Sequence, residues 1–188
     1  MKVTCVVGSA RNCGSTAYLI DAMAEAMTGQ GISVRKYCIS DMKIQYCLGC
    51  KQCYLDGKCV QKDDVAEMVA CILDSDYVVM AAPSYWAGVP GQLKTFFDRN
   101  TPYGDTNPNR ILQKQKEIKG IAIAIRAGTH AEENELILNE ISHYYGHLGI
   151  QTVKRISICG VDCLNDLLQK HPEAIQEVIR LGQQIGEL

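Results

Sequence analysis

Five short apolar runs, separated by segments with helical spacing, constrain the fold of this 188-residue chain more than any other feature. Between the runs, apolar residues recur every three or four positions, as they do on one face of a helix. Apolar strands that alternate with helices are typical of a parallel sheet covered by helices on both faces. The sequence therefore predicts an α/β protein in which a five-stranded parallel sheet lies between two helical layers, with residues 1–188 forming one domain. The runs lie at residues 3–7, 32–39, 77–82, 118–125 and 152–158.

The composition narrows the classes of function. A net charge of −2 provides no basic surface that would favour nucleic acid or an anionic membrane. The apolar run within residues 1–8 is shorter than the core of a secretory signal, and no apolar run reaches membrane-spanning length. Ten cysteines without such signals indicate a reducing compartment. We therefore expect a cytoplasmic protein whose thiols serve metal or redox chemistry.

Four of the ten cysteines, Cys47, Cys50, Cys53 and Cys59, lie within thirteen residues. The two-residue gaps between the first three let neighbouring sulfurs turn toward one point, and C-x2-C-x2-C opens the bacterial ferredoxin signature for a [4Fe-4S] cluster. The fourth cysteine of that signature serves a second cluster, but no second cysteine run is present, so Cys59 would have to close the same cluster. Three other interpretations of this cysteine-rich loop, residues 41–60, stay open: a zinc site, disulfides, or reduced thiols beside a flavin site.

A second group of candidate residues lies in the loop at 8–16, between the first strand and the first helix. Small residues in this loop let the backbone approach an anion, and a helix N-terminus favours phosphate. A Walker lysine and the G-x-G-x-x-G fingerprint are both absent, so neither of those motifs explains the loop. Cys5 and Arg11 have the C-x5-R spacing of phosphate-handling thiol enzymes, but Cys5 lies inside the predicted strand and is interpreted as a buried cysteine. The alternative is an N-capped loop that binds nothing.

Two further loops, at 83–90 and 126–130, follow the third and fourth predicted strands. The carboxyl ends of parallel strands share one edge of the sheet, so these loops and the first one converge there. Tyr85 and Trp86 offer planar faces, which suit a ligand with a flat ring system and one phosphate, such as FMN. Packing or a subunit interface is the alternative role for the two rings. In the third loop, backbone donors could meet a ring edge, and we interpret His130 as a solvated histidine.

Three stretches of the chain, in this order, resemble a known family. They read Gly8-Ser-x-Arg-x-x-Gly14-Ser-Thr16, the cysteine run followed by Asp63-Asp64, and Pro83-x-Tyr-Trp-x-x-Val-Pro-x-Gln-Leu-Lys94-x-Phe-Phe-Asp-Arg99. Together they are similar to the NADPH-dependent FMN reductase superfamily, and specifically to its iron–sulfur flavoprotein branch. The similarity covers roughly residues 1–160.

This resemblance implies a flavodoxin-like fold, an FMN cofactor, a [4Fe-4S] cluster and a homodimer or homotetramer. By position, the phosphate of FMN would be held by Ser9, Arg11, Asn12, Gly14, Ser15 and Thr16. The flavin ring would be lined by Pro83, Ser84, Tyr85, Trp86, Gly88, Ala127, Gly128 and Thr129. The cluster would be ligated by Cys47, Cys50, Cys53 and Cys59.

We therefore predict an FMN-dependent oxidoreductase or electron carrier. It would pass electrons from NAD(P)H or a ferredoxin-like donor to a small-molecule or protein acceptor, and no side chain needs to act as a catalytic acid or base, because the flavin carries the chemistry. The alternatives are an FMN or quinone reductase without a cluster, a non-enzymatic thiol or metal redox sensor, and a structural zinc protein without flavin.

Overall fold

The computed structural model describes residues 1–110 and 117–188. Within these residues, five strands form one parallel sheet in the order β2-β1-β3-β4-β5. This order confirms the predicted flavodoxin-like fold, because the chain reverses direction across the sheet between β1 and β3. The strands are β1 (Lys2–Val7), β2 (Ser33–Cys38), β3 (Tyr77–Pro83), β4 (Ile118–Ile125) and β5 (Ile150–Ile158).

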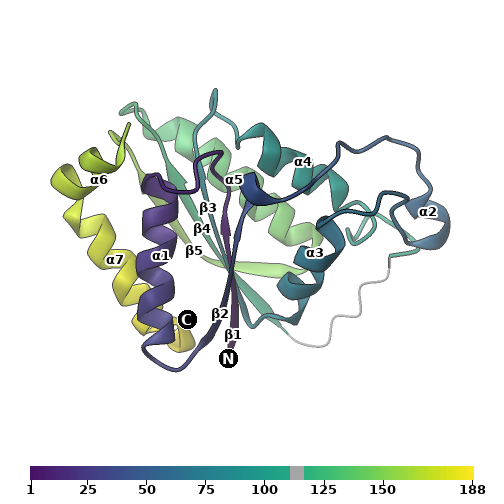
Figure 1. Cartoon of the computed structure of the whole chain (residues 1–188), viewed down its shortest axis with the longest axis horizontal. Coiled ribbons are helices and arrows are strands. Elements are labelled where there is room, and N and C mark those ends of the chain that lie inside the picture. The colour runs from purple at the N-terminus through teal and green to yellow at the C-terminus, as the bar shows by residue number, and fades with distance from the viewer. Residues whose placement is uncertain (111–116) are drawn as a thin grey trace.

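Helices cover both faces of the sheet (Figure 1). One face packs against α1 (Ser15–Thr28), α6 (Leu164–Lys170) and α7 (Pro172–Gln183). The other face packs against α3 (Val65–Asp74), α4 (Gly91–Arg99) and α5 (Ala131–His147). The sequence predicts one closing helix over 161–185 that Pro172 interrupts or restarts, and the structure shows two, with Pro172 opening α7.

The three central strands are buried on both faces, which explains why their sequences are continuous apolar runs. Along β1, Cys5 faces the cluster built with α1 and α7, whereas the next residue, Val6, faces the cluster built with α3, α4 and α5. Along β3, Val79 faces the first of these clusters and Met80 faces the second. All four side chains are fully buried, so the loops that leave these strands start from fixed positions.

The two edge strands depart from the apolar pattern. β2 is largely exposed, and Arg35 and Lys36 lie in its centre. β5 carries Lys154 and Arg155 at the opposite edge, and its middle residues are exposed or half-buried. The expectation of strands that are apolar throughout therefore holds for the central strands and is wrong for β2 and β5, because one side of an edge strand meets solvent.

The chain between β2 and α3 projects away from the body of the protein (Figure 1). It begins with the 3-10 helix η1 (Ile39–Asp41) and contains the short helix α2 (Cys53–Asp56) within the cysteine run. The sequence did not predict α2, because four residues carry no helical periodicity. A second 3-10 helix, η2 (Ile185–Glu187), ends the described chain.

The polar stretch at 100–116, which follows α4 directly, is the least defined part of the sequence, and its length is unusual for a connection. Residues 100–110 make a series of turns, and residues 111–116 lie outside the described residues. Among the helices that the structure describes, none combines the length and the apolar character needed to cross a membrane.

Candidate functional site

A cavity of about 160 Å³ opens at the carboxyl edge of the sheet, where the loops after β1, β3, β4 and β5 meet. We call it the strand-end cavity. It lies beside the point where the strand order reverses, which is the usual ligand position in open α/β sheets. Its lining residues are Ser9, Arg11, Gly14, Ser15, Thr16, Pro83, Ser84, Tyr85, Ile125, Arg126, Ala127, Val161 and Asp162.

The N-terminus of α1 forms the part of this cavity that is best suited to an anion. Gly14 occupies the N-cap position, no side chain caps the helix, and its first turn contains no acidic residue. The first N–H groups of α1 are therefore left to a ligand, and the helix dipole favours a negative charge there. The Arg11 side chain passes beside Gly14, because a Cβ atom on that glycine would lie 3.7 Å from both Cβ and Nε of Arg11.

The loop before α1 is fixed by close contacts with the sheet. Gly8 N donates to the carbonyl of Ala81 at 2.8 Å, which extends the pairing of β1 with β3. A side chain at Gly8 would collide with Leu93, whose Cδ2 atom would lie 2.6 Å from the added Cβ. The hydroxyl of Ser9, itself buried, accepts a hydrogen bond from Arg11 N at 3.0 Å. Only a residue without a side chain therefore lets the loop turn at this point.

The second loop forms a tight turn at the rim of the cavity. Tyr85 and Gly88 exchange two backbone hydrogen bonds of 2.9 and 3.1 Å. Between them, Trp86 and Ala87 have φ angles of 52° and 59°, as in a type I′ turn. Neither of these residues is glycine, so the turn holds two residues in a left-handed conformation that L side chains disfavour. The indole of Trp86 is fully exposed as a result.

Arg126, in the third loop, is a cavity residue that the sequence analysis did not assign. Its guanidinium donates to the carbonyl of His130 at 2.5 Å and pairs with Glu133 at 2.9 Å. Its Nε atom is buried and has no hydrogen-bond partner. A buried donor without a partner is costly, so an acceptor from a bound ligand would stabilise this arrangement.

Nine of the fourteen predicted cofactor residues line the strand-end cavity, and five do not. Asn12 turns away, because its side chain donates to Asp41 at 3.2 Å. Trp86 points into solvent, and Gly88 lies in the turn behind Tyr85. Gly128 and Thr129 are not part of the lining, and the Arg126 guanidinium occupies the space next to Gly128.

Two expectations about other polar residues can be compared with the structure. His130 is exposed, in agreement with its interpretation as a solvated histidine. Cys5 is fully buried in β1, and burial raises the pKa of its thiol to about 12. A thiol in this state does not act as a nucleophile, so the prediction of a buried cysteine is confirmed. Val161 and Asp162 were missed, although their position just after β5 follows from the carboxyl-edge rule.

The four clustered cysteines line a separate cavity of about 150 Å³, which we call the cysteine cavity. Gly49 and Lys51 have φ angles of 62° and 58°, and these two left-handed residues wind the chain around the cavity. All ten cysteines lie within the described residues and all are unpaired, so the disulfide alternative has no support. The cysteines at its wall are Cys47, Cys50, Cys53 and Cys59.

The described residues contain no group of three or more His, Cys, Asp or Glu side chains that could hold a metal ion as they stand. A [4Fe-4S] cluster makes a different demand, because each cysteine binds a separate iron atom and the sulfurs need only surround a common space. The four cysteines meet that looser demand. Burial raises the pKa of Cys53, and the charges of Cys59, Cys47 and Cys50 raise it further.

The buried side chain of Arg99, at the end of α4, holds the cysteine loop against the body of the protein. Its guanidinium donates to the carbonyl of Gln45 at 2.7 Å and forms a bidentate pair with Asp63 at 2.5 and 3.1 Å. It also donates to Sγ of Cys59 at 3.4 Å. The side chains of Arg99 and Asp63 are 1% and 6% exposed, so water screens this pair weakly.

Asp63 and Asp64 mark the start of α3 and also hold the cysteine loop. The sequence predicts the N-cap and first turn of a helix at these two residues. Asp64 does occupy the N-cap position, although its side chain does not cap the helix, and Asp63, one residue earlier, accepts from Val65 N at 3.3 Å. Asp64 instead accepts from Lys43 N at 2.7 Å, and Asp63 accepts from Gln45 N at 3.0 Å. Burial favours a higher pKa for Asp63, but the hydrogen bonds from Arg99, Gln45 and Val65 outweigh it and lower the pKa overall.

One helix connects the two cavities. α4 begins at Gly91, just after the Tyr85–Gly88 turn of the strand-end cavity, with Pro90 at its N-cap position. It ends at Arg99, whose guanidinium contacts Cys59. The third stretch of the sequence resemblance, which ends at Arg99, therefore runs from one cavity to the other.

A 2-1-3-4-5 parallel sheet with an uncapped helix N-terminus in its strand-end cavity defines a flavodoxin-like protein whose switch point suits an anionic ligand. The family described as NADPH-dependent FMN reductase matches residues 1–159. The chain therefore belongs to this family of FMN-binding oxidoreductases.

Individual relatives agree with this assignment. An iron-sulfur flavoprotein of Archaeoglobus fulgidus is 41% identical over 104 residues, which cover 55% of this chain and 47% of that protein. An iron-sulfur flavoprotein of Methanocaldococcus jannaschii is 30% identical over 145 residues, 77% of this chain and 72% of that protein. Among solved structures, an NAD(P)H:quinone oxidoreductase from Methanothermobacter marburgensis has a TM-score of 0.74 at 18% identity and covers 98% of this chain and 96% of its own, which shows the shared fold.

Proposed function

We propose that this chain is an electron-transfer flavoprotein, in which the strand-end cavity binds FMN and the cysteine cavity binds a [4Fe-4S] cluster. One observation carries the proposal. The N-terminus of α1, without a capping side chain or a nearby carboxylate, opens into the strand-end cavity beside Arg11. That combination suits a phosphate monoester at the switch point of a flavodoxin-like sheet.

The cavity residues divide into two groups with respect to FMN. The phosphate would lie at the N-terminus of α1, near Arg11 and the hydroxyl groups of Ser15 and Thr16. The flavin ring would lie between the Tyr85 turn and the third loop, where the unpartnered Nε of Arg126 supplies a donor. When bound, FMN supplies the exchange of one or two electrons, and the protein supplies position and exclusion of water.

The cysteine cavity supports the second half of the proposal. Four thiols surround one space, and the Arg99 guanidinium, a donor to Cys59, offsets part of the negative charge that ligand thiolates bring. Two relatives are named iron-sulfur flavoproteins, and this agrees with a cluster at the cysteine run. The donor would be NAD(P)H or a ferredoxin-like protein, and the family description favours the nicotinamide. The acceptor is a small molecule or a protein, and the predicted homodimer or homotetramer stays a prediction.

The test is an absorption spectrum with flavin, iron and acid-labile sulfide analysis, on protein purified without oxygen. We expect one FMN per chain, a broad absorption shoulder beyond the flavin bands, and about four irons per chain. Cys47→Ser should remove the iron and leave the flavin. Cys163→Ser is the matched control, because Cys163 lies outside the run at the N-cap of α6, where serine also caps a helix.

The outcomes separate the two halves of the proposal. Flavin without iron in the wild type would refute the cluster and favour the second candidate, an FMN or quinone reductase with free thiols. A preparation that binds no FMN when FMN is added would refute the flavin site itself. Turnover with NAD(P)H and a quinone or ferricyanide then distinguishes an enzyme from a redox sensor, which changes state but turns over poorly.

A further inference from the structure

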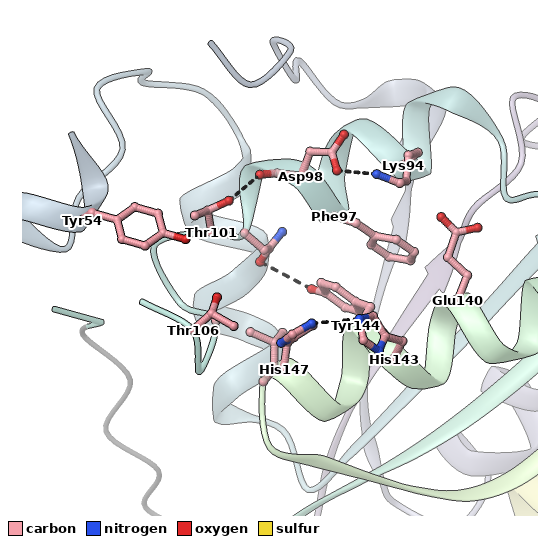
Figure 2. Close-up of a pocket in the computed structure, with 13 residues that line it drawn as sticks. Tyr54, Lys94, Phe97, Asp98, Thr101, Thr106, Glu140, His143, Tyr144 and His147 are labelled. Atoms are coloured by element: carbon pink, nitrogen blue, oxygen red, sulfur yellow. Dashed lines mark hydrogen bonds and ion pairs between the residues drawn. The ribbon is translucent and has the colours of Figure 1, made fainter. Parts of the chain in front are cut away.

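A third cavity, of about 270 Å³, lies between α4 and α5 and away from the strand-end loops. Its wall carries an unusual pair of side chains, His143 and His147, which the proposed function does not use. Figure 2 shows the two imidazoles pointing toward each other from the last turns of α5. Their Nε2 atoms are 3.0 Å apart, and their rings are nearly perpendicular at 83°.

Asp105 fixes the orientation of His147. Its carboxylate lies 2.5 Å from Nδ1 of His147, and its backbone N donates to the carbonyl of the same residue at 3.0 Å. A carboxylate at Nδ1 holds the ring proton there, so Nε2 carries the lone pair and faces His143. Metal-binding histidines show this same arrangement, in which a carboxylate orients the ring and raises its basicity.

The separation of the two nitrogens matches two ligands of a single ion. With a metal–nitrogen bond of about 2.0–2.1 Å, two neighbouring ligand nitrogens lie roughly 2.9–3.4 Å apart. Two imidazole lone pairs at this distance repel each other, so the contact needs either a hydrogen on Nε2 of His143, which gives an N–H···N hydrogen bond, or a metal ion that both nitrogens bind. The pair also lies at the C-terminal end of α5, where the helix dipole favours positive charge.

The surroundings of the pair leave space for the remaining ligands. His143 is exposed, and the side chain of His147 is 37% exposed, so a hydrated ion can reach both nitrogens. Lys94, the lysine that lines this cavity, pairs with Asp98. Glu140 lies one turn before His143 but points away from the pair (Figure 2), and its carboxylate accepts from Val89 N at 3.3 Å. No third His, Cys, Asp or Glu of the described residues completes a group, so water would fill the other positions.

We propose that His143 and His147, oriented by Asp105, form a second metal site, which takes a first-row transition metal ion that prefers imidazole, such as Zn²⁺. This site is separate from the four cysteines. Both ligands belong to α5, and a metal on Nε2 of His147 would strengthen the hydrogen bond by which Nδ1 of the same ring holds Asp105 and its segment. The same segment donates from Asn107 to the carbonyl of Cys53 at 2.9 Å and from Asn109 to that of Tyr54 at 2.7 Å, so the metal would also steady the wall of the cysteine cavity.

The test must distinguish imidazole binding from binding by thiols. Long-range ¹H–¹⁵N NMR of ¹⁵N-histidine-labelled protein does so, because it reports each of the four histidines separately. Zn²⁺ is added in steps, past the amount that the cysteines take up. We expect the Nε2 signals of His143 and His147 to shift together and to saturate, while those of His130 and His171 stay unchanged.

Two variants sharpen the measurement. His143→Gln should abolish the saturable response of His147, and His130→Gln, a matched loss of one exposed histidine, should not. Asp105→Asn keeps the shape of the side chain and should weaken Zn²⁺ binding about 10–100-fold. If the two signals do not respond to excess Zn²⁺, or if they shift no more than that of His130, the pair forms only a hydrogen bond and the proposal is wrong.

Discussion

The strand-end cavity and the cysteine cavity have nearly the same volume, about 160 and 150 Å³, but they are built in opposite ways. The first is formed where buried strands end, and backbone contacts such as Gly8 to Ala81 hold its loops. The second lies on a projecting loop that is held largely by side chains, above all by Arg99 and Asp63. The first cavity should therefore persist as long as the sheet does, whereas the second should be lost locally when one ion pair is broken.

The largest effect is expected from Arg99→Leu. Removing the cation leaves the Asp63 carboxylate buried and unpaired, which typically costs about 3–5 kcal/mol. We expect the cysteine loop to detach, so that limited proteolysis cuts within residues 45–62 while FMN binding survives. The double variant Arg99→Leu, Asp63→Leu should recover protease resistance in part, since it leaves no buried charge but still lacks the hydrogen bonds to Gln45. Equal sensitivity of the single and double variants would contradict this account.

Charge at the other cavity should act on the ligand rather than on the fold. Ser15→Asp places a carboxylate in the first turn of α1, where it favours the helix but repels a phosphate. We expect FMN binding to weaken about 10–100-fold, or about 1.4–2.7 kcal/mol. Riboflavin, which lacks the phosphate, should bind as before.

The fluorescence of Trp86, the single tryptophan of the chain, follows this titration from the rim of the cavity. Ser33→Asp is the control, because it makes the same change at the exposed start of β2. An equal loss of FMN and riboflavin binding in Ser15→Asp would show that the phosphate is not at the α1 terminus.

Two glycine substitutions compare the cavities directly. Gly8→Ala pushes a methyl group against Leu93 and the Ala81 carbonyl, and overpacking of this kind costs about 1–3 kcal/mol of global stability. Gly49→Ala meets open space and is disfavoured only by its left-handed backbone, at about 1 kcal/mol. In urea unfolding, Gly8→Ala should lower the unfolding midpoint by the amount that corresponds to the whole of this cost. Gly49→Ala should reduce retention of the cluster and leave the unfolding midpoint nearly unchanged. A larger midpoint shift in Gly49→Ala than in Gly8→Ala would contradict the view that only the strand-end cavity depends on the sheet.

The smallest effect is a pH dependence at Asp63. Because the folded state lowers its pKa below the usual 3.8, this carboxylate contributes stability that is fully present above pH 3.8 and is lost as the pH falls through the folded pKa. Because a single proton is involved, the unfolding free energy changes by at most about 1.4 kcal/mol per pH unit. The difference in unfolding free energy between wild type and Asp63→Asn should therefore be constant from pH 7 to pH 5 and shrink below pH 3.8. A gap that widens in acid would contradict the lowered pKa.

The fold could be predicted because its signals are local. Continuous apolar runs mark the central strands, and helical periodicity with Pro90 and Pro172 marks two helix starts. The position of the edge strand β2 was predicted, but its burial was not. Arg35 and Lys36 are tolerated in this strand because one of its sides meets solvent. Burial on both faces cannot be read from a strand until its place in the sheet order is known.

The site was predictable only in part, because side-chain partners depend on distant residues. The switch-point rule located the loops that carry most of the strand-end cavity. It could not show that Asn12 would turn to Asp41, or that Arg126 would fill the space beside Gly128. The pairing of Arg99 with Asp63 joins residues 36 positions apart and leaves no periodic signal in the sequence.

The charged edge strands described above also bear on how copies of this chain can associate. An open sheet offers unpaired N–H and C=O groups along both edges, and another strand can add to them and start aggregation. Here lysine and arginine side chains occupy the middle of both edges, at Arg35 and Lys36 on β2 and at Lys154 and Arg155 on β5. Each of these cations is paired with a carboxylate on a neighbouring helix, Glu67, Asp21, Glu177 and Glu135 in turn. A strand that adds to either edge has to displace these long, paired side chains, so growth of the sheet into fibrils is disfavoured.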